Sequence, residues 1–169
     1  MKNNLDKSRK KASQGGIHRN KKMCYTLITI LIMVFIFIQS SLPANLSARE
    51  SGLISGFLAR LLKQDPEATS FLIRKCAHFT EYMFLGISLF LTIGEHLASS
   101  AILSRPVFLI AWGIGTFYAL TDEIHQFFTP GRSCELRDMC IDSAGVLTGI
   151  LLICLIRKKL RKSSSDVTG

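Results

Sequence analysis

Four long apolar segments constrain the fold of this 169-residue chain more than any other feature of its sequence. They cover residues 23–42, 76–93, 106–121 and 138–156, and each is close to the ~20 residues with which a helix crosses the hydrocarbon core of a bilayer. Hydrophobic residues make up 48% of the chain, which also favours membrane helices over a soluble core. The sequence therefore predicts an all-α integral membrane protein, a bundle of four transmembrane helices.

The basic residues predict how these spans are oriented. The net charge is +9, and eight Lys or Arg residues fall within residues 1–22 and five within residues 157–162. Because Lys and Arg that flank spans stay on the cytoplasmic side, four spans place both termini in the cytoplasm. Both basic clusters border apolar segments, which indicates contact with the lipid bilayer rather than with nucleic acid.

The chain divides into three parts, and its sequence contains no internal repeat and no second domain. Residues 1–22 are predicted to be a disordered basic cytoplasmic tail, residues 23–156 the membrane domain, and residues 157–169 a basic and polar cytoplasmic tail. A signal peptide is the alternative for the first span, but Leu46-Ser47-Ala48 matches a cleavage site poorly.

The segment between the first two spans is amphipathic. Over residues 51–63 the large apolar side chains fall on one half of a helical wheel, which predicts a short helix in the outer interface. A helix packed over the end of the bundle fits the same pattern equally well. Asp65 and Pro66 follow as an N-cap and a first-turn proline, so the second membrane helix is expected to begin there.

Polar residues gather where the second span begins, the third ends and the fourth begins. A charge within a span costs about 2.5–3.5 kcal/mol on insertion scales, so such residues rarely occur there without a role. In the predicted orientation all three places face the outer side and form one candidate polar site. Its members are Lys75, His78, Glu81, Tyr82, Asp122, Glu123, His125, Gln126, Arg132, Asp138 and Asp142.

Helical spacing brings several of these residues onto common faces. At ~100° per residue, His78 and Glu81 share one face of the second span with Lys75 and Tyr82. A function is favoured for His78 and Glu81, whereas an ion pair that only positions the helix explains Lys75 equally well. In the fourth span Asp138 and Asp142 continue a stripe of small residues, Gly145 and Gly149, that lets a neighbouring helix approach closely.

Two adjacent acids close the third span, where the helix dipole disfavours negative charge. Compensation for Asp122 and Glu123 is expected from Arg132, Arg137 or Lys75, from a shared proton, or from a divalent metal ion. No segment has the spacing of a metal motif, so the sequence predicts no cofactor and keeps a metal only as an alternative.

The cysteines leave a second alternative open. Cys76, Cys134 and Cys140 all fall near the predicted outer ends of the spans, so a disulfide among them is one interpretation. Small apolar fillers that pack without pairing are the simpler interpretation. The five cysteines show no metal-type spacing.

The motifs taken together resemble the VanZ-like family of bacterial membrane proteins over residues 27–156. One departure is that Asp142 stands where many members carry asparagine, which adds a carboxylate to the polar site. The motifs that carry the resemblance are Ser40-Ser41-Leu42-Pro43, Lys75-Cys76-Ala77-His78-Phe79-Thr80-Glu81-Tyr82, Thr121-Asp122-Glu123-Ile124-His125-Gln126, Pro130-Gly131-Arg132, and the run from Asp138 through Asp142 to Gly145 and Gly149.

The resemblance implies a protein of the bacterial cell membrane and gives no catalytic residue to carry over. The founding member of the family is associated with resistance to teicoplanin, a lipid-bearing glycopeptide. The expected function is therefore a contribution to teicoplanin resistance through the outer polar site, with a lipid-linked envelope precursor or an amphiphilic glycopeptide as partner.

Two other functions compete with this expectation. The alternative is a membrane-embedded enzyme that acts on a lipid-linked envelope substrate. His78, Glu81 and Asp142 would then supply acid–base chemistry, and a metal would be held by Asp122, Glu123 and Asp138. Four spans without an inverted repeat disfavour a transporter.

Overall fold

The structure, a computed structural model, consists of long helices and contains no strand among the residues that it describes. These are residues 2–43, 65–97, 105–132 and 134–167, together with Gly52, Gly56 and Arg60. The predicted amphipathic helix over residues 51–63 therefore lies outside the described residues, apart from these last three. The helices are α1 (Lys2–Ser40), α3 (Pro66–His96), α4 (Arg105–Phe127) and α5 (Leu136–Val167).

Each helix contains a segment that is long and apolar enough to cross a membrane. Many large apolar side chains, Leu31, Phe117 and Leu155 among them, point outward, as the surface of a bundle in lipid requires. The prediction of a multi-pass, all-helical membrane protein is thus confirmed. The four segments are His18–Ser40, Ala68–His96, Arg105–Phe127 and Leu136–Ser163.

Two helix starts test the predictions made from local sequence. Helix α3 begins as expected, because the Asp65 carboxylate accepts a hydrogen bond of 3.1 Å from the backbone N–H of Ala68 and Pro66 occupies the first turn. The prediction of disorder over residues 1–22 is wrong for its described part, since α1 begins at Lys2. No proline precedes Pro43, so a helix nucleated in the apolar span can extend through the basic segment.

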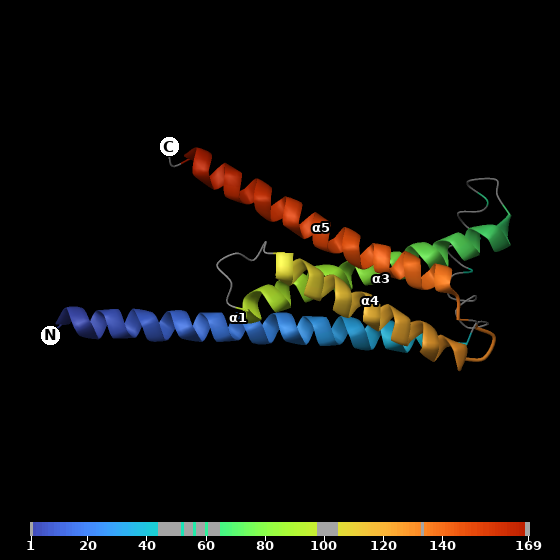
Figure 1. Cartoon of the computed structure of the whole chain (residues 1–169), viewed down its shortest axis with the longest axis horizontal. Helices are drawn as coiled ribbons and strands as arrows, with labels where there is room; N and C mark the ends of the chain where they lie inside the picture. The colour runs from blue at the N-terminus through green and yellow to red at the C-terminus, as the bar shows by residue number, and fades with distance from the viewer. Residues whose placement is uncertain are drawn as a thin grey trace.

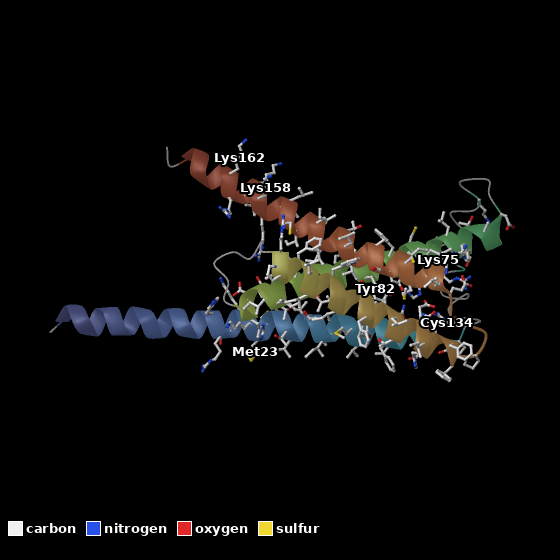
Figure 2. The ribbon with its side chains drawn as sticks, viewed as in Figure 1. Met23, Lys75, Tyr82, Cys134, Lys158 and Lys162 are labelled. Carbon is white, nitrogen blue, oxygen red and sulfur yellow. The ribbon has the colours of Figure 1, made fainter. Side chains whose placement is uncertain are left out.

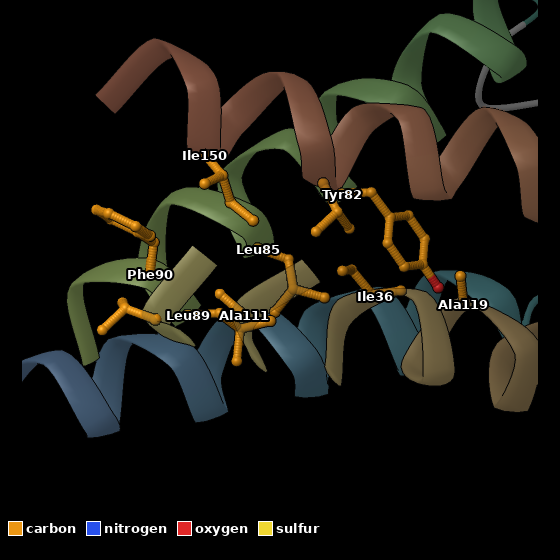
Figure 3. Packing of buried hydrophobic residues seen from close by; sticks show 10 residues of the cluster. Ile36, Tyr82, Leu85, Leu89, Phe90, Ala111, Ala119 and Ile150 are labelled. Carbon is orange, nitrogen blue, oxygen red and sulfur yellow. The ribbon is translucent and has the colours of Figure 1, made fainter. Parts of the chain in front are cut away.

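Helix α3 lies at the centre of the bundle and contacts the other three helices (Figure 1). The buried core joins Ile36 of α1, Leu85 and Phe90 of α3, Ala111 of α4 and Ile150 of α5 (Figure 3). Both ends of the chain lie toward the same end of the bundle, at the left of Figure 1. The end of α4 and the start of α5 therefore lie at the opposite end.

The contact between α3 and α5 is the most extensive in the bundle, and glycines make it possible. A Cβ atom added at Gly145 would lie 2.5 Å from the carbonyl oxygen of Phe79, and one added at Gly149 would overlap the carbonyl oxygen of Met83. Gly86 provides the same close approach from the α3 side, against the backbone of Val146. Small residues thus let the two backbones touch directly.

Candidate functional site

The polar residues predicted from the sequence lie at the end of the bundle opposite the two termini. Figure 2 shows Lys75 and Cys134 at this end, and Lys158 and Lys162 near the other. A cavity of about 150 Å³ opens here between α3, α4 and α5. Its lining residues are Phe71, Arg74, Lys75, His78, Glu123, Gln126, Gly131, Arg132, Glu135, Asp138, Ile141 and Asp142.

An ion pair joins two helices at the wall of this pocket. The ammonium group of Lys75 on α3 donates to the carboxylate of Asp138 on α5, and both side chains are largely buried. The same ammonium lies 4.9 Å from the centre of the Phe71 ring, within reach of a cation–π interaction. The charge of Lys75 is therefore largely committed to holding α3 against α5.

Asp122 is held from two directions. Its Oδ2 atom accepts hydrogen bonds from the Ser40 hydroxyl at 2.7 Å and from the Gln126 amide at 3.2 Å. The Gln126 amide also donates to the Ser40 hydroxyl at 3.3 Å, which closes a buried three-residue network. The network ties the end of α1 to α4 and fixes the direction in which the carboxylate points.

Three ligand-type side chains meet beside the pocket, one from each of three helices, and two of them, His78 and Asp142, line it. A ring nitrogen of His78, a carboxylate oxygen of Asp122 and a carboxylate oxygen of Asp142 all lie within 4.8 Å of one another. Among the described residues, His78 Nδ1 and the Oδ1 atoms of both aspartates have no hydrogen-bond partner. This convergence is not visible along the sequence, where the three residues belong to separate segments.

The other predicted residues take separate positions around this group. Glu81 Oε2 lies 3.9 Å from His78 Nδ1, one helical turn away. Tyr82 is fully buried among the hydrophobic residues of the core (Figure 3). Glu123 accepts the backbone N–H of Glu135 at 2.9 Å and so anchors the segment that leads into α5.

His125 faces α1 rather than the pocket. Its ring stacks on Phe37 with 4.6 Å between ring centres, and its Nε2 atom lies 3.0 Å from the Ser41 hydroxyl. It is not among the residues that line the cavity. Glu81, Tyr82 and Asp122 are also absent from the lining, but His125 is the predicted member whose ring contacts the end of α1.

The sequence analysis did not include two residues of the site, Arg74 and Ser40, although the sequence around each gave an indication of its role. Arg74 precedes Lys75, and a second basic residue at the start of a span was a sign of a cationic pocket wall. Ser40 belongs to a motif that was noticed but received no role. Both were overlooked because their partners lie on other helices.

Two arginines line the pocket beside several carboxylates. Within the described part of the chain, neither Arg74 nor Arg132 forms an ion pair. Arg137, which does not line the cavity, pairs with Glu135, which does. Burial, followed by the positive charge of Arg74, lowers the pKa of the Arg132 guanidinium from its ordinary value, and nearby carboxylates oppose this shift. An anion placed between the two guanidinium groups would relieve their repulsion.

The cysteines form no disulfide, since all five are free thiols. Cys76, Cys134 and Cys140 are exposed near the polar end, and Cys24 and Cys154 belong to α1 and α5. The disulfide alternative is therefore not adopted in this fold.

The fold and the polar end together define a multi-pass helical membrane protein with a charged pocket at one end of its bundle. The chain matches the VanZ/LLP1 family over residues 25–157, well over half of its length, and it belongs to that family. The resemblance seen in the motifs is thereby confirmed. No curated protein and no solved structure matches the chain.

Proposed function

We propose that this pocket binds the anionic headgroup of an envelope amphiphile at the outer surface of the bacterial cell membrane. One observation carries the proposal: Arg74 and Arg132 line the cavity and have no ion-pair partner among the described residues. Guanidinium groups favour bidentate hydrogen bonds to phosphate and carboxylate, so a pair of them suits a phosphate-bearing headgroup.

The size of the pocket supports a headgroup rather than a whole ligand. A cavity of about 150 Å³ is smaller than the ~300–1,000 Å³ typical of sites that enclose a drug-sized molecule. A lipid or a lipid-bearing glycopeptide would therefore insert only an anionic group and leave its chains along the apolar outer surface of the bundle. Phospholipids and lipid-linked envelope precursors both carry the required phosphate.

The basic residues at the opposite end of the bundle support the outer location, which can be tested with native thiols. In a variant whose only cysteine is the exposed Cys134, a membrane-impermeant maleimide is expected to label intact cells. As a control, Ser163→Cys in a cysteine-free background should react only after lysis, because Ser163 lies at the basic end. The reverse pattern would place the pocket in the cytoplasm and overturn the proposed location.

The headgroup site predicts a specific loss of lipid binding. Arg74→Gln and Arg132→Gln are each expected to weaken binding by about tenfold or more, since a hydrogen bond to a charged group contributes about 1.5–3 kcal/mol. Native mass spectrometry of the purified chain with phosphatidylglycerol and with undecaprenyl phosphate measures this and separates the two phosphate sources. Phosphatidylcholine serves as the zwitterionic comparison.

Arg137→Gln is the matched control for this experiment. It removes an exposed arginine from the same end of the bundle, but this residue does not line the cavity. Equal loss in Arg137→Gln and Arg132→Gln would indicate diffuse surface attraction and would count against a pocket. Unchanged binding in both pocket variants would exclude the guanidinium pair as the headgroup site.

A second function, a membrane enzyme acting on a lipid-linked envelope substrate, is favoured by a different observation. His78 and Asp142 line the same cavity, and each has a buried polar atom without a hydrogen-bond partner among the described residues. Such groups could move protons at a bound headgroup. Turnover distinguishes this function, because simple binding leaves the lipid chemically unchanged.

We also propose that occupation of this pocket contributes to teicoplanin tolerance. The support is the chain's membership of the VanZ/LLP1 family, whose founding member is associated with teicoplanin resistance, together with the proposed outer location of the site.

A further inference from the structure

We infer that His78, Asp122 and Asp142 form a binding site for one divalent transition-metal cation, such as Zn²⁺ or Mn²⁺. One side chain comes from each of α3, α4 and α5, so the site exists only in the folded bundle. The inference deepens the proposed function, because His78 and Asp142 also line the headgroup pocket. It replaces the set of Asp122, Glu123 and Asp138 that the sequence suggested as metal ligands.

The geometry of the three side chains suits a small cation. Their ligand atoms all lie within 4.8 Å of one another. Zn²⁺ binds imidazole nitrogen and carboxylate oxygen at ~2.0–2.2 Å, so modest side-chain rotations bring all three onto one ion. One imidazole and two carboxylates would leave further coordination positions for water or a ligand.

The two carboxylates are deeply buried, and neither forms an ion pair with a described lysine or arginine. Asp122 is 3% exposed and Asp142 is 1% exposed, and the Oδ1 atom of each has no hydrogen-bond partner in the described structure. Across the described ranges, no lysine or arginine forms an ion pair with either of them. Buried charges are ordinarily paired or coordinate metals, and one divalent ion would balance both carboxylates.

The surroundings hold Asp122 as a metal ligand is usually held. Ser40 and Gln126 both donate to its Oδ2 atom, while Oδ1 has no hydrogen-bond partner among the described residues. Hydrogen bonds of this kind orient ligating carboxylates and tune their affinity for the ion. This arrangement also gives the Ser40 hydroxyl a role, since it reaches the site from the end of α1.

An ion at this position would face the same cavity as Arg74 and Arg132. It would present a third positive centre to an anionic headgroup and would polarise a phosphoryl oxygen that reached it. The pocket would then combine two lining arginines with a metal bound beside it.

The test uses the full chain purified in neutral detergent without added lipid, stripped with EDTA and titrated with ZnCl₂ or MnCl₂. Metal content by mass spectrometry should approach one ion per chain, and the unfolding temperature, followed by fluorescence, should rise by about 5–10 °C. Asp142→Asn should weaken metal affinity by about 100-fold or more, and Ser40→Ala by about tenfold. Glu123→Gln, in the competing ligand set, should bind like the wild type.

Several outcomes would overturn this inference. Wild-type protein that retains no metal and gains no stability would do so, and a proton shared by the two aspartates would then explain the cluster. If Glu123→Gln loses the metal and Asp142→Asn keeps it, the ion is bound by the competing set of Asp122, Glu123 and Asp138. If Asp142→Asn does not fold, the titration of the wild type and the metal affinity of Ser40→Ala still test whether the site binds an ion. The titration contains no lipid, so a protein that binds no metal would not contradict the headgroup site. That site is tested separately by lipid binding to the arginine variants.

Discussion

Replacing Gly149 with valine is expected to destabilise the bundle by about 2–3 kcal/mol or to prevent its assembly. The Cβ atom of any larger residue would overlap the carbonyl oxygen of Met83 and lie 2.9 Å from its carbonyl carbon and 3.2 Å from the backbone nitrogen of Ile87. These are backbone atoms of α3, so no side-chain rotation can relieve the overlap. Thermal unfolding of the purified protein in detergent, monitored by size-exclusion chromatography, measures the effect.

Gly113→Val provides the matched control. Gly113 lies on the exposed side of α4, and an added Cβ atom there has no heavy atom within 4 Å. This variant should unfold close to the wild-type temperature, whereas Gly149→Ala should show part of the valine effect. Equal destabilisation in Gly113→Val and Gly149→Val would show that the loss comes from valine in a helix and not from the α3–α5 contact.

The glycine contact also sets the geometry of the polar pocket. Helix α3 carries Lys75 and His78, and α5 carries Asp138, which pairs with Lys75, and Asp142, which lies within 4.8 Å of His78. The distance between these pairs therefore depends on how closely the two backbones approach at Gly145 and Gly149. Variants that force the helices apart should weaken ligand binding even though no residue of the pocket has changed.

The sequence predicted the features that depend on local chemistry. Span length and hydropathy predicted the four membrane helices, and the Asp65-Pro66 pair predicted where α3 begins. Helical spacing also placed Gly145 and Gly149 on one face, and that face meets α3. Each of these inferences needs only one helix, whose periodicity is known without the rest of the fold.

The rest of the site depends on how helices rotate about their own axes when they pack. Periodicity places Asp122 and His125 in the same helical turn, but only packing decides that Asp122 meets Ser40 and His78 while His125 stacks on Phe37. Glu123, which the sequence offered as one of three carboxylate ligands for a metal, accepts the backbone N–H of Glu135 in the structure. Groups that converge from three helices have no spacing signal along the chain.

Expression of this chain in a susceptible bacterium is expected to raise the teicoplanin concentration that the cells tolerate, with little change for vancomycin. Under the proposed function the difference arises because teicoplanin bears a lipid chain and meets the envelope at the outer leaflet, where the pocket would lie. Arg132→Gln and Asp142→Asn should return tolerance to that of cells with an empty vector, since each removes a charged group from the cavity lining. Susceptibility assays at matched membrane abundance measure this.

Arg137→Gln again distinguishes an effect of the pocket from an effect of the positive charge on the surface. It leaves the cavity lining intact, so it should preserve tolerance while Arg132→Gln loses it. Tolerance that survives in Arg132→Gln and Asp142→Asn would dissociate resistance from the polar site. If the wild-type protein is abundant in the membrane but gives no tolerance, teicoplanin resistance is excluded as its function. The lipid-binding experiment does not depend on that result. The pocket would then serve an envelope lipid, and phosphate-bearing lipids would be the ligands to pursue.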